Sequence, residues 1–192
     1  GLGTKVESDL LPYDMQIAAG LDWAVEKQSL VTSEGIVVPK KKALIRSSDQ
    51  TVLDVVGDEW QPCQNDTAFQ FFNDFCLKGD MEMHTAGSLQ DGRIVWVLAK
   101  VKDSFELFGG DQVDSYLLFS NPHKFGQSID VRFTPIRVVC NNTLTLSLNS
   151  SSKNAVKLNH KKAFDADNVK EMLGIANVKL SDYKEMAEHL GG

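Results

Sequence analysis

The stretch Met81-Glu-Met-His-Thr-Ala-Gly-Ser-Leu-Gln-Asp-Gly-Arg-Ile-Val-Trp-Val-Leu-Ala-Lys-Val101 decides the fold class. Its centre, Gln90-Asp-Gly92, predicts the tight turn of a β-hairpin, because Asp-Gly accepts the positive backbone angles that such a turn needs. The second arm, Arg93–Val101, is apolar almost throughout, which is typical of a central strand. This stretch therefore predicts a hairpin at the middle of an antiparallel sheet.

Short β-rich runs lie on both sides of this hairpin, and turn residues separate them, which favours a meander. We expect strands over residues 23–31, 36–38, 43–45, 51–56, 115–119 and 129–133, with 136–140 as a continuation of the last one. The clearest helix spans Asn65–Gly79, where apolar residues recur at helical spacing and a glycine closes the run. The aromatic residues of this helix are interpreted as core rather than as a cofactor site.

Further helices are expected near residues 9–20, 141–148, 167–173 and 181–190, although the threonines of 141–148 leave a strand open there. The fold class is therefore α+β: an antiparallel β-meander and hairpin sheet with packed helices and a helical C-terminal segment. We place an α+β core domain at residues 1–150 and a C-terminal helical extension at 151–192, after the polar Ser150-Ser-Ser152 link.

The charge is distributed unevenly along the 192 residues, whose formal net charge is −6. Residues 49–91 are strongly acidic, whereas residues 40–46 and 124–162 are basic. A basic lobe beside an acidic one can hold a polyanion despite an acidic total. The candidate phosphate contacts are Lys40, Lys41, Lys42, Arg46, Arg132, Arg137, Lys157, Lys161 and Lys162. The alternation around Phe133 predicts that Phe133 is buried and Arg132 exposed, and Arg137 has a buried acid as its alternative partner.

No pattern in the sequence predicts a metal or a cofactor. The four histidines have no ligand-like spacing with each other or with the cysteines, and a Gly-rich phosphate loop is missing. Two groups of acids, Asp54 with Asp58 and Asp111 with Asp114, leave a Mg²⁺-dependent nuclease as an alternative if they converge in one cleft. The three cysteines are widely spaced, and a reducing cytoplasm is the natural interpretation.

Several blocks of the sequence resemble a known family: Gly1-Leu-Gly-Thr4, Ala19-Gly-Leu-Asp-Trp23, Val55-Val-Gly57 with Pro62, Thr85-Ala-Gly87 with Gly92-Arg93, and Thr134-Pro-Ile-Arg-Val-Val-Cys-Asn-Asn-Thr-Leu144. The chain is similar to the phage- and plasmid-like proteins of domain of unknown function 932, over about residues 1–160. The resemblance implies a mobile genetic element as the source and carries no catalytic residues with it. Family members extend further at both ends, so we expect this chain to be the core of a longer protein.

Three functions remain open on these grounds. The first is a phage- or plasmid-encoded single-stranded DNA-binding protein that assists strand annealing or recombination without ATP, as a homo-oligomer in the cytoplasm of a bacterial host. The expected architecture is analogous to the Rad52-like annealing proteins, although such an analogy concerns the fold alone. The second is an interaction or assembly protein without enzymatic activity, including an inhibitor of host defence. The third is the metal-dependent nuclease.

Overall fold

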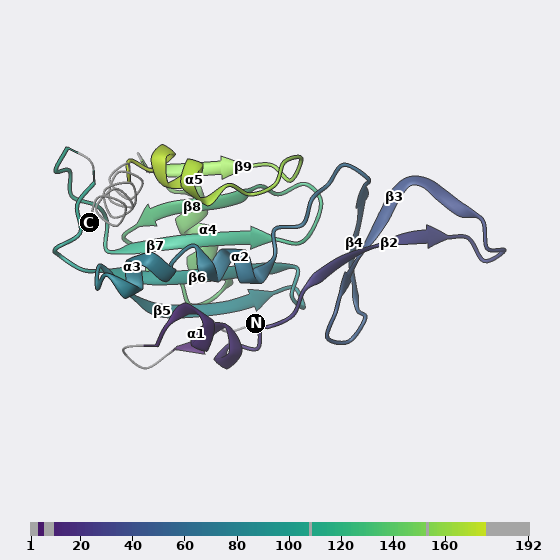
Figure 1. Cartoon of the computed structure of the whole chain (residues 1–192), viewed down its shortest axis with the longest axis horizontal. Coiled ribbons are helices and arrows are strands. Elements are labelled where there is room, and N and C mark those ends of the chain that lie inside the picture. The colour runs from purple at the N-terminus through teal and green to yellow at the C-terminus, as the bar shows by residue number, and fades with distance from the viewer. Residues whose placement is uncertain (1–3, 6–9, 108, 153, 176–192) are drawn as a thin grey trace, which may run out of the picture.

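The computed structural model describes residues 4–5, 10–107, 109–152 and 154–175. Within them, two antiparallel sheets form (Figure 1). The larger sheet has the strand order β1-β5-β6-β7-β8-β9, and the smaller one has the order β2-β3-β4. The α+β prediction is therefore confirmed.

The strands of the larger sheet are β1 (Thr4–Lys5), β5 (Met81–Leu89), β6 (Ile94–Val101), β7 (Tyr116–Pro122), β8 (Ile129–Thr134) and β9 (Ala155–Leu158). The predicted hairpin is confirmed at its centre, where β5 pairs with β6 from Met81↔Val101 to Leu89↔Ile94. Gln90, Asp91 and Gly92 all take positive φ, as the Asp-Gly turn requires. Strand β6 is buried except at Lys100, in agreement with its apolar sequence.

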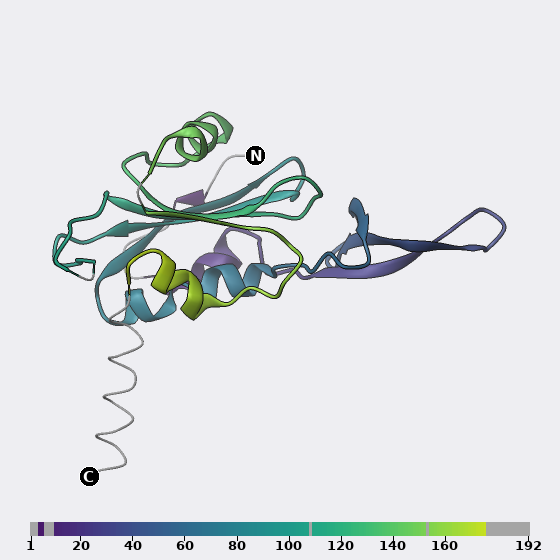
Figure 2. The ribbon, with the colours of Figure 1, turned by 90° about the horizontal axis from the view of Figure 1, so that it is seen from above.

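Helices cover both faces of the larger sheet (Figure 2). On one face lie α1 (Pro12–Ala18), α2 (Asn65–Gln70), α3 (Asn73–Leu77) and α5 (Ala166–Met172). The aromatic residues of α2, α3 and the turn between them join the main core there, with Phe71, Phe72 and Phe75 each at most 2% exposed. The other face carries α4 (Asn141–Asn149), which packs Leu144 over Trp96 and Leu118.

The smaller sheet forms an arm that projects from one end of the body (Figures 1 and 2). Its strands are β2 (Val25–Val31), β3 (Val37–Arg46) and β4 (Val52–Gly57). A small core of its own supports it, made of Val25, Leu44, Leu53, Val56 and Trp60. We call residues 24–58 the arm and residues 31–37 its tip.

Three expectations about individual elements need correction. Runs 36–38 and 43–45 form one continuous strand, β3, because Lys40 takes a φ of 62° and carries the chain past Pro39. The helix expected over 65–79 is two short helices, α2 and α3. Residues 136–140 do not continue β8; they lead into α4, which is a helix and not a strand.

The last strand of the sheet was not expected from the sequence. β9 pairs with β8 from Ile129↔Leu158 to Arg132↔Ala155, inside the segment expected to be a helical extension. α5 matches the helix expected at 167–173 within one residue, and Asp165 caps it by accepting a hydrogen bond from the Asn168 amide. The helix expected at 181–190 lies outside the described residues.

Candidate nucleic-acid interface

Three of the predicted lysines line one hollow between β9 and α5. This hollow has a volume of about 540 Å³, and Lys157, Lys161 and Lys162 are among its lining residues. All three side chains are exposed, and within the described residues none of them has an ion-pair partner. Three lysines therefore outnumber the one acid that lines the hollow, Asp165, whose carboxylate already accepts the hydrogen bond that caps α5.

Phe164 forms an apolar wall of the same hollow. Its ring is half-buried and packs against Phe119, with ring centroids 5.2 Å apart, and against Phe71 at 6.1 Å. Two core rings therefore hold this aromatic side chain in place at the edge of the lysine-lined hollow. Exposed aromatic surface beside cationic groups is what sequence-tolerant binding of single strands uses.

The arm carries the second group of predicted lysines, on β3. Lys40 and Lys41 are exposed, whereas Lys42 is half-buried and donates a hydrogen bond from Nζ to Ser29 Oγ, 3.3 Å away. The Lys40 carbonyl accepts a hydrogen bond from the Asp58 amide at 3.2 Å, where β4 ends. The lysines of the arm therefore stand beside the segment that leads from the arm back to the body.

That connecting segment also contacts the lysine-lined hollow. Trp60 stacks on His160, with ring centroids 3.9 Å apart and planes 14° apart. The Gln61 amide donates a hydrogen bond to the His160 carbonyl, and His160 Nδ1 lies 3.1 Å from the Gln61 carbonyl oxygen. The structure thus brings the two basic stretches to the same end of the molecule. The exposed acids Asp58 and Glu59 lie between them.

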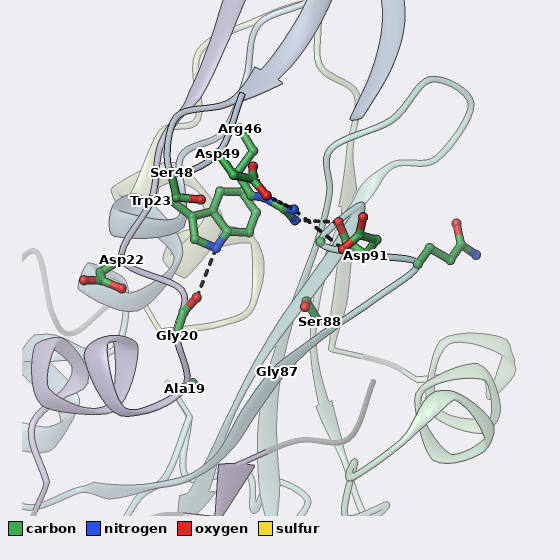
Figure 3. A pocket seen from close by; sticks show the side chains of 12 residues that line it. Ala19, Gly20, Asp22, Trp23, Arg46, Ser48, Asp49, Gly87, Ser88 and Asp91 are labelled. Atoms are coloured by element: carbon green, nitrogen blue, oxygen red, sulfur yellow. Dashed lines mark hydrogen bonds and ion pairs between the residues drawn. The ribbon is translucent and has the colours of Figure 1, made fainter. Parts of the chain in front are cut away.

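Arg46 lies apart from these lysines and is neutralised. It forms two hydrogen bonds with the carboxylate of Asp49, at 3.0 and 2.8 Å, and donates a third to the Asp91 carbonyl at 2.7 Å. These contacts form one wall of a second hollow of about 590 Å³, where the guanidinium also lies over the Trp23 ring (Figure 3). The guanidinium lowers the pKa of Asp49 far below its ordinary value.

Arg132 is buried, so the expectation that its side chain is exposed is wrong. The residue is 2% exposed, and its guanidinium pairs with Asp130 through two hydrogen bonds of 2.7 Å. It also donates to the carbonyls of Ser147 and Ser150 at the end of α4. The alternation of residues along β8 gave the wrong prediction for Arg132 because α4 covers the face of the strand that would otherwise be in contact with water. Arg132 therefore anchors α4.

Arg137 is exposed but lies on the α4 side of the sheet. Its Nε donates to His84 Nε2 on β5, at 2.8 Å. The partner is a histidine, and not the buried acid that the sequence left open as an alternative. This arginine therefore does not join the lysine-lined hollow, which opens between β9 and α5.

The acids considered for metal binding do not converge in the described part of the chain. Asp54 belongs to β4 and accepts a hydrogen bond from the Phe125 amide at 2.7 Å, and Asp58 follows β4. Asp111 and Asp114 lie between β6 and β7, and the described residues contain no group of three metal-ligating side chains. The arrangement on which the nuclease hypothesis depends is therefore not formed here.

A buried polar cluster at the junction between arm and body was not foreseen from the sequence. Asn121 donates to the Cys63 carbonyl at 2.7 Å, and His123 Nε2 lies 2.8 Å from Asn65 Oδ1. Asn65 Nδ2 donates to the Leu21 carbonyl, so its Oδ1 faces His123, and Nε2 of that histidine must carry the proton. Burial lowers the pKa of His123 to about 3, with the nearby His160 as a smaller cause.

Two of the three thiols lie in surroundings that disfavour the reactive thiolate. Burial raises the pKa of Cys63 to about 12 and that of Cys76 to about 11. Cys140 begins α4, where its amide donates to Thr143 Oγ1 at 3.1 Å, and hydrogen bonds from Thr143 lower its pKa. Cys140 therefore has a capping role at the start of α4.

Comparison of the sequence with models of known protein families gives a match. The family described as "Domain of unknown function (DUF932)" matches residues 52–191, well over half of the sequence. The chain belongs to the DUF932 family. The matched residues include the larger sheet from β5 onward and every residue that lines the lysine hollow, while β2 and β3 of the arm precede them. Neither the curated proteins nor the solved structures gave a match to this DUF932 chain. None of its described helices has the length and apolar character that crossing a membrane demands.

Proposed function

We propose that this DUF932 protein binds single-stranded DNA and assists strand annealing or recombination without ATP, as a phage- or plasmid-encoded protein in a bacterial host. The observation that carries the proposal is the hollow between β9 and α5, which Lys157, Lys161, Lys162 and Phe164 line together. Lysines supply the phosphate contacts that dominate nucleic-acid affinity, and they release condensed counterions when they do so.

The size of the hollow favours a single strand over a duplex. A volume of about 540 Å³ lies in the range of small-molecule pockets and suits one or two nucleotides whose bases are turned out of the stack. A duplex keeps its bases inside and offers only backbone to such a site. Only the bases of an unpaired strand can therefore stack on Phe164.

Annealing itself needs no energy source from the protein, because stacking in the new duplex is favourable by about 1.4 kcal/mol per base-pair step. The protein has only to hold one strand with part of its bases accessible. The α+β architecture, with a β-hairpin at the centre of the sheet and helices packed on it, agrees with the Rad52-like analogy. That analogy supports the proposal at the level of the fold.

The experiment measures binding of a fluorescein-labelled 30-nucleotide strand by anisotropy, over a range of salt concentrations. The test variant is Lys161→Glu with Lys162→Glu. The matched control is Lys78→Glu with Lys100→Glu, which makes the same charge change on exposed side chains at the end of β5 and β6 remote from the arm. We expect the test variant to bind at least about tenfold more weakly and with a smaller salt slope, and the control to lose little.

Two results would overturn the proposal. One is a well-folded wild-type protein that binds no oligonucleotide at low salt. The other is an equal loss of affinity in both double variants, which would show only a general effect of net charge. Addition of the complementary strand then tests annealing directly, by the rate at which a quencher on that strand lowers the fluorescence.

A further inference from the structure

The tip of the arm exposes three large apolar side chains. Val31 is 58% exposed, Ile36 61% and Val37 58%, and no described part of the chain covers them. Val31 and Val37 are direct register partners of β2 and β3, so their side chains lie next to each other on one face. Exposed apolar side chains that cluster at the end of a projecting sheet are typical of surfaces that contact another chain.

Positive charge accompanies this apolar cluster. Lys40 and Lys41 follow it on β3 and are both exposed. The outer part of the arm, residues 29–42, contains three lysines and a single acidic residue, Glu34. The outer arm is therefore apolar at its tip and cationic directly behind it.

A complementary surface lies on the body, where α1 packs against α2. A hollow of about 350 Å³ opens between these helices, and Tyr13 and Phe69 are among its lining residues. Tyr13 is 68% exposed and Ile17 is 47% exposed, and their i, i+4 spacing places them on one side of α1. Apolar surface is therefore available on this face as well.

The charge on this face is negative. Asp66 on α2 is exposed and lines the hollow, Asp14 on α1 is exposed but is not among the lining residues, and neither helix contains a lysine or arginine. Asp66 also accepts a hydrogen bond from Gln16, which fixes its carboxylate beside the hollow. The α1–α2 groove is thus apolar and anionic, the counterpart of the apolar and cationic arm tip.

Within one chain, the two surfaces are directed apart. The arm extends away from the body, and its tip is about 20 Å beyond Val25 at roughly 3.3 Å per strand residue (Figures 1 and 2). We propose that the arm tip of one protomer docks into the α1–α2 groove of a second copy of this chain. Because the contact joins two different surfaces, it either repeats from copy to copy in a ring or filament, or closes a dimer in which the two copies exchange arm tips.

This assembly does not rest on the DNA-binding function. It uses Lys40 and Lys41 toward the carboxylates of a neighbour and leaves Lys157, Lys161 and Lys162 free for phosphate. The sequence alone assigned Lys40 and Lys41 to nucleic acid. Binding of the arm tip to DNA is therefore one outcome that the experiment must be able to show.

The first experiment uses cysteine cross-linking with the purified full chain. One variant carries Ile36→Cys at the arm tip, and the other carries Ile17→Cys on α1. Under mild oxidation we expect a disulfide dimer of the two chains only when both variants are mixed. A dimer of Ile36→Cys alone would show an arm-to-arm contact, and no cross-link in the mixture would also overturn the proposal. Wild-type protein reports any background from Cys76 and Cys140, which are partly exposed.

The second experiment measures mass in solution by light scattering and sedimentation. Val31→Asp with Val37→Asp should weaken self-association at least about tenfold, because apolar anchors dominate such interfaces. Val52→Asp with Val55→Asp is the matched control, since both residues lie on β4 of the same arm and are 50% and 41% exposed. High salt should weaken the wild-type assembly in the same direction. A monomeric wild type, equal effects of both variants, or lost oligonucleotide binding with unchanged mass would each contradict the proposal.

Discussion

Trp60 lies flat on His160, with ring centroids 3.9 Å apart and an angle of 14° between the planes. One ring follows the last strand of the arm, and the other precedes Lys161 and Lys162. The same pair of segments is joined by the hydrogen bond from the Gln61 amide to the His160 carbonyl. The stack therefore sets where the lysine-lined hollow stands relative to the arm.

Removal of this stack should loosen both segments. Trp60 is 9% exposed, and truncation of a buried tryptophan costs about 3 kcal/mol or more, so we expect Trp60→Ala to lower the free energy of unfolding by that amount. Hydrogen exchange should show faster exchange of the Gln61 amide, which loses its fixed acceptor. Val55→Ala on the exposed side of the arm is the control. An unchanged exchange rate of the Gln61 amide in Trp60→Ala would show that the stack of Trp60 on His160 does not hold the two segments together.

The junction histidines make stability depend on pH. Burial lowers the pKa of His123 to about 3 and also lowers that of His160, so both are neutral in the folded protein near pH 7. Between about pH 6.5, the ordinary value, and the folded pKa, the unfolded chain binds more protons than the folded one. The contribution of these two histidines to the free energy of unfolding is therefore complete above about pH 6.5. Below that pH the free energy of unfolding decreases, by up to about 1.4 kcal/mol per pH unit for each histidine.

Urea denaturation between pH 7 and pH 5 measures this dependence, because most carboxylates remain ionised in that range. His123→Gln keeps a side-chain donor for Asn65 Oδ1 and removes the titrating ring, so its pH slope should be smaller than that of the wild type. Identical slopes would show that His123 does not contribute.

The hairpin could be predicted because its information is local. Asp91 and Gly92 fix the turn, and the apolar run from Ile94 fixes a central strand, so no distant residue was needed. The helix at α5 was accessible for the same reason, since Asp165 caps it from its own chain segment. A single sequence is therefore sufficient to predict the elements whose turn and capping residues lie within the same short segment of the chain.

The site depends on contacts between distant segments, and there sequence reasoning failed. β9 has four residues, and it forms because β8 offers a free edge. His123 and His160 gain their burial from residues 61–65, which precede them by about sixty and a hundred positions. Lys157, Lys161 and Lys162 were found from charge alone, but nothing in their spacing indicated that Phe164 stands beside them in one hollow.

The buried pair of Asp130 and Arg132 should be costly to break. Asp130→Asn leaves a guanidinium at 2% exposure without its carboxylate, so we expect a loss of about 3 kcal/mol in the free energy of unfolding. The double variant Asp130→Asn with Arg132→Met removes both charges and should recover part of that loss. A loss below about 1 kcal/mol in Asp130→Asn would show that the pair is unimportant for the position of α4.

Gly92 supports the base of the arm by leaving space for two side chains. A Cβ atom at this position would lie 2.6 Å from Arg46 Nη1 and 3.3 Å from Trp23 Cζ2, and the residue has a φ of +90°. Gly35 has a similar φ of +84° but open space around its Cβ position. Gly35→Ala therefore measures the cost of backbone strain alone, about 1 kcal/mol.

We expect Gly92→Ala to cost about 1–2 kcal/mol more than Gly35→Ala, because the Arg46 guanidinium must leave its hydrogen bonds with Asp49 and Asp91. A double-mutant cycle with Arg46→Ala isolates this contribution. In the Arg46→Ala background the cost of Gly92→Ala should fall toward that of Gly35→Ala, because most of the obstruction is gone. If the cost stays the same in both backgrounds, the close approach of Arg46 to the β5–β6 turn is not what requires glycine there.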